Sequence, residues 1–154
     1  MSRAFVKDSE DRETFDLPDR PISTHPNLVT AEGLEAIEAE VARWQHDLTA
    51  AQTADDREQQ AKAGRELRYW SARRGSAQVV APPKDAREVH FGSTVVVERD
   101  DGRRQTFRIV GEDEADPAHG TLSHASPLAR ALFGKGVGDV VRVANGEAEV
   151  VEIR

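Results

Sequence analysis

The sequence contains no cysteine, which excludes disulfide frameworks, thiolate nucleophiles and cysteine-ligated zinc. Aromatic residues make up only 5% of the 154 positions and apolar residues 38%, so we expect a modest hydrophobic core. No apolar run approaches the roughly 20 residues of a membrane span, and no apolar stretch of a secretory signal follows Arg3 and Lys7. We therefore expect a cytoplasmic protein without a membrane segment.

The charge is net acidic, −7, and it is unevenly distributed. Residues 31–56 carry −6, whereas residues 57–80 carry +4. A net acidic chain is unsuited to tight, sequence-independent binding of a nucleic acid duplex, which needs clustered cations. The opposite signs of these two neighbouring segments indicate instead that they pair with each other.

Residues 1–29 combine six acidic residues with three prolines and show no hydrophobic periodicity. This composition predicts an extended or disordered acidic arm.

Residues 30–76 predict an antiparallel hairpin of two helices. Thr30 is a suitable N-cap, and apolar residues then recur at spacings of 3, 4, 3 and 4, the pattern of a coiled-coil seam. The predicted seam residues are Leu34, Ile37, Val41, Trp44 and Leu48 in the first helix, with Leu67 and Trp70 in the second. An intramolecular hairpin of this kind predicts a monomer.

We expect the seam to be interrupted at residues 49–54, where the chain turns. Thr53 and Asp56 resemble a capping box that opens the second helix. Each helix would then contain about 20 residues and extend about 30 Å.

Residues 77–154 change to a period of two and predict a small twisted antiparallel sheet crossed by one short helix. Asp101-Gly102 and Asn145-Gly146 are strong hairpin-turn signals. Ser126 is a good N-cap for the short helix, Pro127 suits its first position, and Gly134 ends it. The predicted fold class is therefore α+β, with segments 1–29, 30–76 and 77–154.

The sequence shows no arrangement of side chains that is typical of a catalytic or metal site. The five histidines lack ligand spacing, which argues against a metal site. Ser123 and His124 are adjacent on a predicted strand, where neighbouring side chains point to opposite faces, so they predict no catalytic dyad. We expect no catalytic residues, no metal and no cofactor.

The second half of the chain resembles the bacterial Gre factors, which rescue stalled RNA polymerase by stimulating transcript cleavage. The matching motifs are FRIVGEDEAD and HASPLARALFGKGVGDVVRV, with Arg108–Gly111, Asp113-Glu114, Ser126–Arg130, Gly134-Lys135 and Gly138-Asp139 at the family's positions. The resemblance covers roughly residues 28–154 and implies an FKBP-like fold for the head.

The resemblance also implies a division of labour. The head would dock at the rim of the polymerase secondary channel, and the coiled coil would enter that channel. Carboxylates at the coil tip would help to hold Mg²⁺ in the polymerase's own active site, so that the factor itself is not the nuclease. The docking surface is predicted to include Ser126, Pro127, Asp113 and Glu114, which lie in the matched block.

The coil tip departs from the family pattern, which is D-x-x-E followed by tyrosine. Asp47 is followed three residues later by Ala50, and the only tyrosine is Tyr69. Asp55, Asp56 and Glu58 offer substitute carboxylates, although acids at a helix start also stabilise the helix dipole and serve as caps.

The expected length of the coil differs as well. The family's coil is longer by about three turns per helix, so this tip would end about 15 Å short of the metal. In coil length the chain is similar to Rnk, a short-coil relative.

We therefore expect a transcription elongation regulator that binds RNA polymerase without efficient cleavage stimulation. Two alternatives stay open: a genuine cleavage-stimulating factor that uses Asp47, Asp55 or Asp56, and a small interaction adaptor unrelated to polymerase. Contact with nucleic acid through the basic residues of 57–76 is expected only within a polymerase complex.

Overall fold

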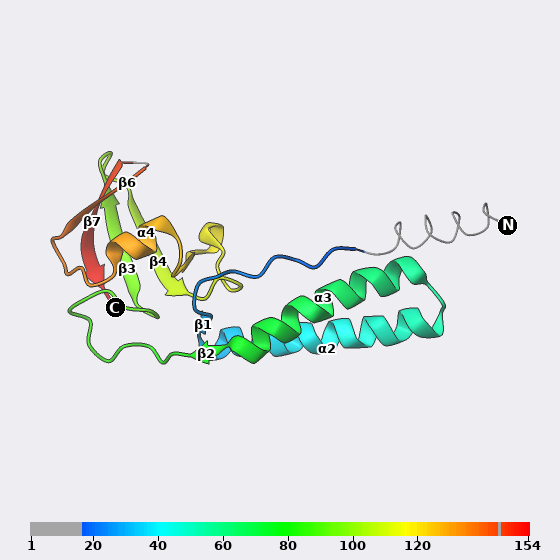
Figure 1. The fold of residues 1–154 in the computed structure, drawn as a ribbon. Coiled ribbons are helices and arrows are strands. Elements are labelled where there is room, and N and C mark those ends of the chain that lie inside the picture. Colours follow the sequence, from blue (N-terminus) through cyan, green and yellow to red (C-terminus); the bar gives the residue numbers. More distant parts are fainter. Residues whose placement is uncertain (1–16, 145) are drawn as a thin grey trace. The chain divides into compact units, whose positions relative to one another are not determined.

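The computed structural model describes residues 17–144 and 146–154. Residues 1–16 of the predicted arm, and Asn145 of the second predicted turn, lie outside the described residues. The chain forms two compact units (Figure 1). Of the described residues, the helical unit contains 17–24 and Ile37–Ser76, and the sheet unit contains His25–Ala36 and Ala77–Arg154. Residues 30–36 thus cluster with the sheet, while the predicted division into domains at residues 30 and 77 stays a prediction.

The helical unit is built on two helices, α2 (Ala31–Thr53, 23 residues) and α3 (Arg57–Ser76, 20 residues). The predicted interruption after Leu48 is wrong, because α2 continues for five more residues, of which Ala50, Ala51 and Gln52 are good helix formers. Ala51 is 4% exposed and takes the next seam position, three residues after Leu48.

The predicted capping box at Thr53 is also wrong. Thr53 lies inside α2 and donates its hydroxyl hydrogen bond to the Thr49 carbonyl, 3.1 Å away. Asp56 is the residue that caps α3, since its carboxylate accepts a hydrogen bond from the Gln59 backbone N–H at 3.1 Å. Asp55 forms the turn with a left-handed φ of 52°, a conformation that aspartate tolerates.

The seam of α2 is better buried than that of α3. Ile37, Val41 and Trp44 are 1%, 5% and 8% exposed. On α3, the buried apolar residue is the small Ala63. The other predicted seam residues are partly buried: Leu34, Leu48, Leu67 and Trp70.

The sheet unit contains a five-stranded sheet in the order β5-β4-β3-β7-β6. Its strands are β3 (Thr94–Arg99), β4 (Arg104–Val110), β5 (Thr121–Ser123), β6 (Val140–Val143) and β7 (Gly146–Ile153). The prediction of a purely antiparallel sheet is wrong for one pair, because β4 and β5 are parallel. The connection between them, which includes the 3₁₀ helix η1 (Pro117–His119), is long enough to return the chain to the starting end of the sheet.

A second, two-stranded sheet was not expected. Leu28–Val29 (β1), assigned to the predicted arm, pairs in parallel with Gln78–Val79 (β2). The pairing tethers the two chain segments that enter and leave the helical hairpin. Sequence patterns could not show it, because each strand has only two residues.

The turn between β3 and β4 follows the Asp-Gly signal. The Gly102 N–H donates to the Arg99 carbonyl at 2.9 Å, and Gly102 has a left-handed φ of 83°. The four residues 100–103 therefore connect the strands, and the glycine supplies the left-handed position that such a turn requires. At the other hairpin β6 and β7 pair as predicted, with Gly146 opposite Val143 and thus within the strand.

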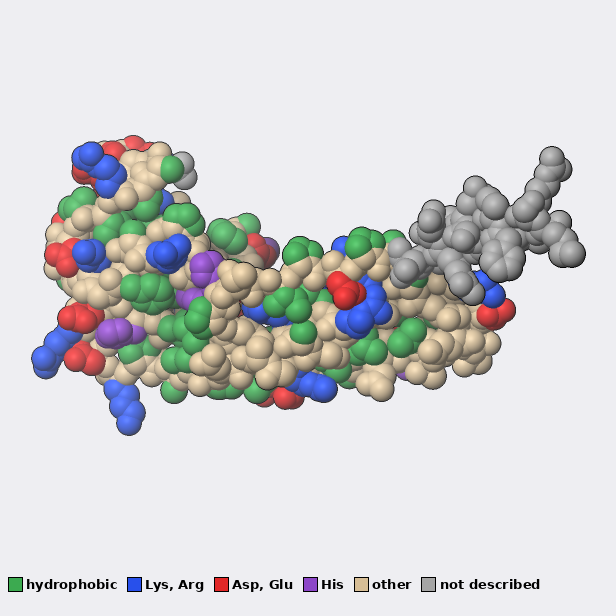
Figure 2. All heavy atoms as spheres, viewed as in Figure 1, with side chains coloured by type: hydrophobic (Ala, Val, Ile, Leu, Met, Phe, Trp, Pro, Cys, Tyr) green, Lys and Arg blue, Asp and Glu red, His purple; other side chains and the backbone are tan. Residues whose placement is uncertain are grey.

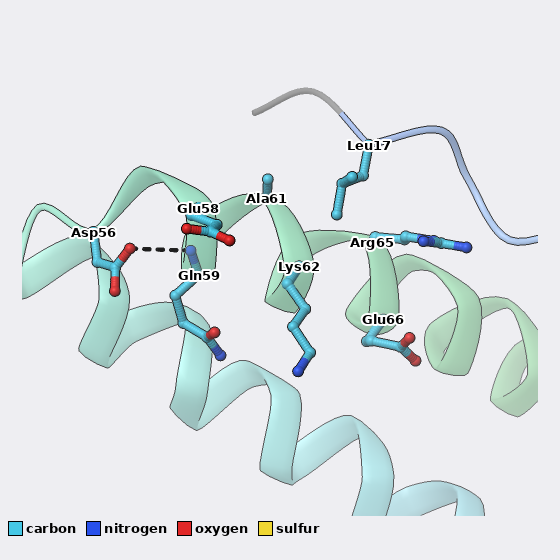
Figure 3. Close-up of a pocket in the computed structure, with 8 residues that line it drawn as sticks. All are labelled: Leu17, Asp56, Glu58, Gln59, Ala61, Lys62, Arg65 and Glu66. Carbon is cyan, nitrogen blue, oxygen red and sulfur yellow. Dashed lines mark hydrogen bonds between the residues drawn. The ribbon is translucent and has the colours of Figure 1, made fainter. Parts of the chain in front are cut away.

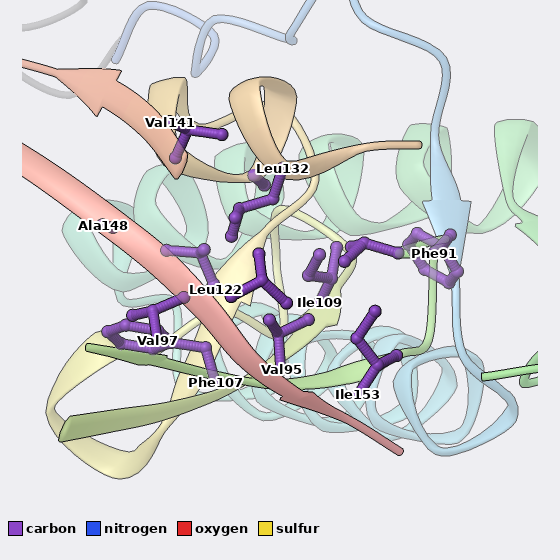
Figure 4. Packing of buried hydrophobic residues seen from close by; sticks show 13 residues of the cluster. Phe91, Val95, Val97, Phe107, Ile109, Leu122, Leu132, Val141, Ala148 and Ile153 are labelled. Carbon is purple, nitrogen blue, oxygen red and sulfur yellow. The ribbon is translucent and has the colours of Figure 1, made fainter. Parts of the chain in front are cut away.

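One helix, α4 (Pro127–Leu132), covers the hydrophobic core of the sheet (Figure 4). Leu132 is fully buried and packs with side chains from the sheet strands, among them Val95, Ile109 and Val150, all 0% exposed. Alternate residues of the strands point into this core, as the period of two predicts. Within the described part of the chain, no helix is both long and apolar enough to cross a bilayer.

Candidate functional site

The parallel pairing of β4 and β5 brings two of the sequence motifs to the same end of the sheet. Val110 lies opposite Ser123, and the His124 N–H donates to the Val110 carbonyl at 2.9 Å. The acidic turn that begins at Gly111 and the segment that leads to Ser126 therefore leave the sheet side by side. Two motifs that are separate in the sequence therefore lie next to each other in the fold.

Ser126 and Pro127 open α4 as expected. The Ser126 hydroxyl accepts a hydrogen bond from the Ala129 N–H at 3.3 Å, and Pro127 occupies the first helical position. Ala129 and Leu132 are buried and hold the helix on the sheet. Pro127 is exposed, and Ser126 is partly buried by its capping role. Of this pair, Pro127 is the better placed to contact a partner.

Glu114 has a structural role that its sequence position did not reveal. Its carboxylate accepts hydrogen bonds from the backbone N–H groups of Thr30 and Gly111, both at 3.0 Å, and from the Thr30 hydroxyl. Thr30 in turn caps α2, because its hydroxyl oxygen accepts a hydrogen bond from the Gly33 N–H at 2.9 Å. Glu114 therefore fixes the first turn of α2 to the end of β4, within the sheet unit.

Two glycines make room for this carboxylate. A Cβ atom on Gly33 would lie 2.1 Å from Cδ of Glu114, and a Cβ atom on Gly111 would lie 2.6 Å from the Leu28 carbonyl oxygen. A glycine inside a helical pattern costs stability, so Gly33 was a signal in the sequence that something approaches α2 closely. We refer to Thr30, Gly33, Gly111 and Glu114 as the carboxylate latch.

Glu32 lies beside the carboxylate latch and pairs with Arg108, whose guanidinium nitrogen is 3.7 Å from the Glu32 carboxylate. A hydrogen bond from its own backbone N–H, one from the Thr30 side chain and the positive charge of Arg108 all lower the pKa of Glu32. Negative charge in the first turn of α2 also suits the helix dipole.

The structure separates the roles of the three predicted tip acids. Asp47 and Asp56 line the same shallow depression, together with Ala50, Ala51, Ala54 and Gln59. Asp55 is not among these lining residues, and Asp56 already caps α3. Across residues 17–144 and 146–154, no group of three or more histidine or acidic side chains converges as a metal site would require.

Charge on the surface is mixed. On the face seen in Figure 2, acidic and basic side chains alternate over the sheet unit, and neither sign forms a continuous patch. Ion pairs account for part of this pattern, for example Arg142 with Glu147 at 2.8 Å. Such a surface suits a specific protein contact better than a general attraction to phosphate backbones.

Comparison with known proteins decides the family. Residues 83–154 match the family model described as "Transcription elongation factor, GreA/GreB, C-term". The chain is also similar to transcription elongation factor GreB of Yersinia pestis, with 34% identity over 151 residues that cover 83% of this chain and 88% of the relative. The chain belongs to the GreA/GreB family.

Another relative of this GreA/GreB-family protein matches over a shorter stretch. Transcription elongation factor GreA of Alkalilimnicola ehrlichii is 42% identical over 105 residues, which cover 64% of this chain and 66% of that relative. Among solved structures, GreA factor homolog 1 (Gfh1) of Thermus thermophilus is similar over 84% of this chain and 99% of its own, with 23% identity and a TM-score of 0.40.

Proposed function

We propose that this GreA/GreB-family protein binds bacterial RNA polymerase through its sheet unit, at the rim of the secondary channel, and modulates elongation without efficiently stimulating transcript cleavage. In this proposal it is a cytoplasmic regulator and not itself an enzyme, and it needs no cofactor of its own. Its sheet unit is FKBP-like.

The docking surface is supported by the arrangement at the end of β4 and β5. The segments that follow β4 and β5 lie at the same end of the sheet, within the residues that the family model matches. They carry the exposed Pro127 and the partly buried Asp113 and Ser126. Glu114 belongs to the same block, but its carboxylate is engaged by three internal donors. We therefore place its contribution to docking in the shape of this turn, with Pro127 and Asp113 as the contact residues.

The absence of efficient cleavage stimulation is supported by the hairpin. With 23 residues, α2 extends about 34 Å, which is about 4.5 Å more than expected from the sequence. The expected shortfall of about 15 Å thereby decreases to about 10 Å, still far beyond the roughly 2 Å of a metal–oxygen bond. The observation that carries the proposal is the capping role of Asp56, because its carboxylate accepts a hydrogen bond from the Gln59 N–H and thereby stabilises the start of α3.

The test combines purified core polymerase with a backtracked transcription complex and reads both binding and RNA length. Pro127→Glu changes the exposed surface while it keeps a favourable residue at the first position of a helix. Pro117→Glu is the matched control, because Pro117 is also exposed and also begins a helical turn, at the opposite end of β5. We expect Pro127→Glu to weaken binding at least about tenfold, the effect of removing one contact residue worth about 1.4 kcal/mol.

Equal polymerase affinity of the Pro127→Glu and Pro117→Glu variants would contradict the docking surface. Retention of no polymerase by the unaltered protein would favour the adaptor alternative instead.

A second function is favoured by one observation. Asp47 and Asp56 line the same depression at the hairpin tip, so two carboxylates lie in one place, one of which also caps α3. If the protein is a genuine cleavage-stimulating factor, saturating amounts will shorten the RNA of backtracked complexes in a Mg²⁺-dependent manner, and Asp47→Asn will abolish the effect. RNA of unchanged length at saturation would remove this alternative.

A further inference from the structure

The segment that precedes β1 is held on the helical hairpin by a specific set of contacts. Arg68 of α3 binds the Asp19 carboxylate at 2.6 Å through Nε. The Arg20 guanidinium binds the Glu66 carboxylate, also at 2.6 Å, and lies over the Tyr69 ring with its carbon 3.7 Å from the ring centroid. All of these residues belong to the helical unit. We call Asp19 and Arg20 the clasp.

The order of charges in the clasp matches the order of charges on α3. Asp19 meets a cation and Arg20 meets an anion, so an exchange of the two residues would place like charges together. The cation–π contact of Arg20 adds a geometric requirement that a simple charge match does not have. The contact is therefore selective, unlike a loose attraction between an acidic arm and a basic helix.

The clasp is also built to open. The side chains of Arg68 and Asp19 are 56% and 70% exposed, so water and salt screen their attraction. The Arg20 and Glu66 side chains are less exposed, at 32% and 20%, so their ion pair is screened less than that of Asp19 and Arg68. A competing ligand with several charges could displace such a clasp at a modest cost.

The clasp covers cationic and aromatic side chains that share one face of α3. Arg65, Arg68 and Tyr69 are three and four residues apart and are therefore neighbours on the helix. Next to them lies a hollow lined by Leu17 and α3 residues, in which Leu17 points toward the helix near Lys62 and Arg65 (Figure 3). Nε of Arg65 is buried there and has no hydrogen-bond partner among the described residues.

Cations interleaved with an aromatic ring are the side chains that bind single-stranded nucleic acid, because the cations contact phosphates and the ring stacks on a base. We propose that the clasp is a self-inhibiting contact: residues Asp19 and Arg20 occupy the Arg68–Tyr69 face of α3, and their release exposes it to single-stranded nucleic acid. The proposal does not depend on polymerase docking, because both the clasp and the face lie within the helical unit.

The test measures binding of a fluorescently labelled 12-nucleotide oligo(U) RNA, and of oligo(dT), by anisotropy at low salt. The double variant Asp19→Ala/Arg20→Ala opens the clasp without a change in net charge. The matched control, Asp101→Ala/Arg103→Ala, removes another Asp–Arg pair at 2.6 Å from an exposed turn of the sheet unit. We expect the clasp variant to bind about tenfold more tightly than the unaltered protein, because it loses both ion pairs of the clasp and the cation–π contact of Arg20 with Tyr69. We expect the control to bind as the unaltered protein does.

A third variant tests where the added affinity arises. Arg68→Ala, introduced into the clasp variant, is expected to remove most of the gain and to reduce the salt dependence of binding. Equal affinity of the clasp variant and the unaltered protein would overturn the inhibition. A gain that survives Arg68→Ala would overturn the assignment of the ligand to this face, and so would a failure of every variant to bind either oligonucleotide. Circular dichroism of each variant verifies that the hairpin keeps its helicity.

Discussion

Replacement of Gly33 by alanine tests the carboxylate latch, because the usual effect of this change should be reversed. Glycine to alanine inside a helix normally stabilises a protein by about 0.5–1 kcal/mol. At position 33, however, the new Cβ atom would lie 2.1 Å from Cδ of Glu114. The carboxylate is the far end of a flexible side chain and can move, so the cost is the loss of its hydrogen bonds and not a steric clash.

The magnitude follows from those bonds. Displacement of Glu114 leaves the N–H groups of Thr30 and Gly111 without their acceptor. A hydrogen bond to a charged group contributes about 1.5–3 kcal/mol, and water recovers part of it at this partly buried site. With a loss of about 3 kcal/mol and a helix-propensity gain of about 1 kcal/mol, we expect Gly33→Ala to lower the free energy of unfolding by about 2 kcal/mol.

The assay is urea unfolding followed by circular dichroism, with Gly64→Ala as the matched control. Gly64 lies in α3, where a Cβ atom would meet only the end of the Arg68 side chain at 3.4 Å, so this change should stabilise by about 0.5–1 kcal/mol. In a Glu114→Ala background, Gly33→Ala should also become stabilising, because the obstacle is gone. A stabilising effect of Gly33→Ala in the unaltered protein would refute the reasoning about the carboxylate latch.

Four further predictions follow from single contacts. Leu132→Ala removes a fully buried side chain beneath α4 and should lower the free energy of unfolding by about 3 kcal/mol in urea titrations. Asp56→Ala removes the cap of α3 and should cost about 1 kcal/mol, whereas Asp55→Gly relieves a left-handed residue and should not destabilise; thermal melts of both variants compare the two. Because the folded-state pKa of Glu32 is lowered, its contribution to stability is present above the unfolded-state pKa and is lost as the pH falls through the folded-state value. Glu32→Gln should thus reduce the loss of stability as the pH falls below the ordinary pKa of glutamate, measured by urea unfolding at each pH. Light scattering should give the mass of a monomer at all concentrations, since the seam of α2 is buried within its own chain.

Several local features were predictable because the residues that determine them are neighbours in the sequence. Ser126 and Pro127 start α4, Thr30 caps α2, and Asp101-Gly102 turns β3 into β4. Each signal acts over three or four residues, within reach of a single turn of backbone. The α+β class and the two long helices followed from the change of hydrophobic period, from 3.5 to 2. The motifs of the Gre family likewise stand as continuous stretches of sequence.

The tertiary structure decided what depends on residues far apart in the chain. Glu114 was predicted on a docking surface, yet its carboxylate binds Thr30, 84 positions away. The clasp joins Arg20 to Glu66 across 46 positions, and β5 pairs in parallel with β4 only because a ten-residue connection folds back. Hydrophobic periodicity and capping signals report on a residue's immediate neighbours, whereas the partner of a carboxylate or of an edge strand is chosen by the packing of the whole unit. For this protein the sequence alone determined the two long helices, the short helix α4 and the family, whereas the fold decided that Glu114 and Asp56 are engaged by hydrogen bonds within the chain.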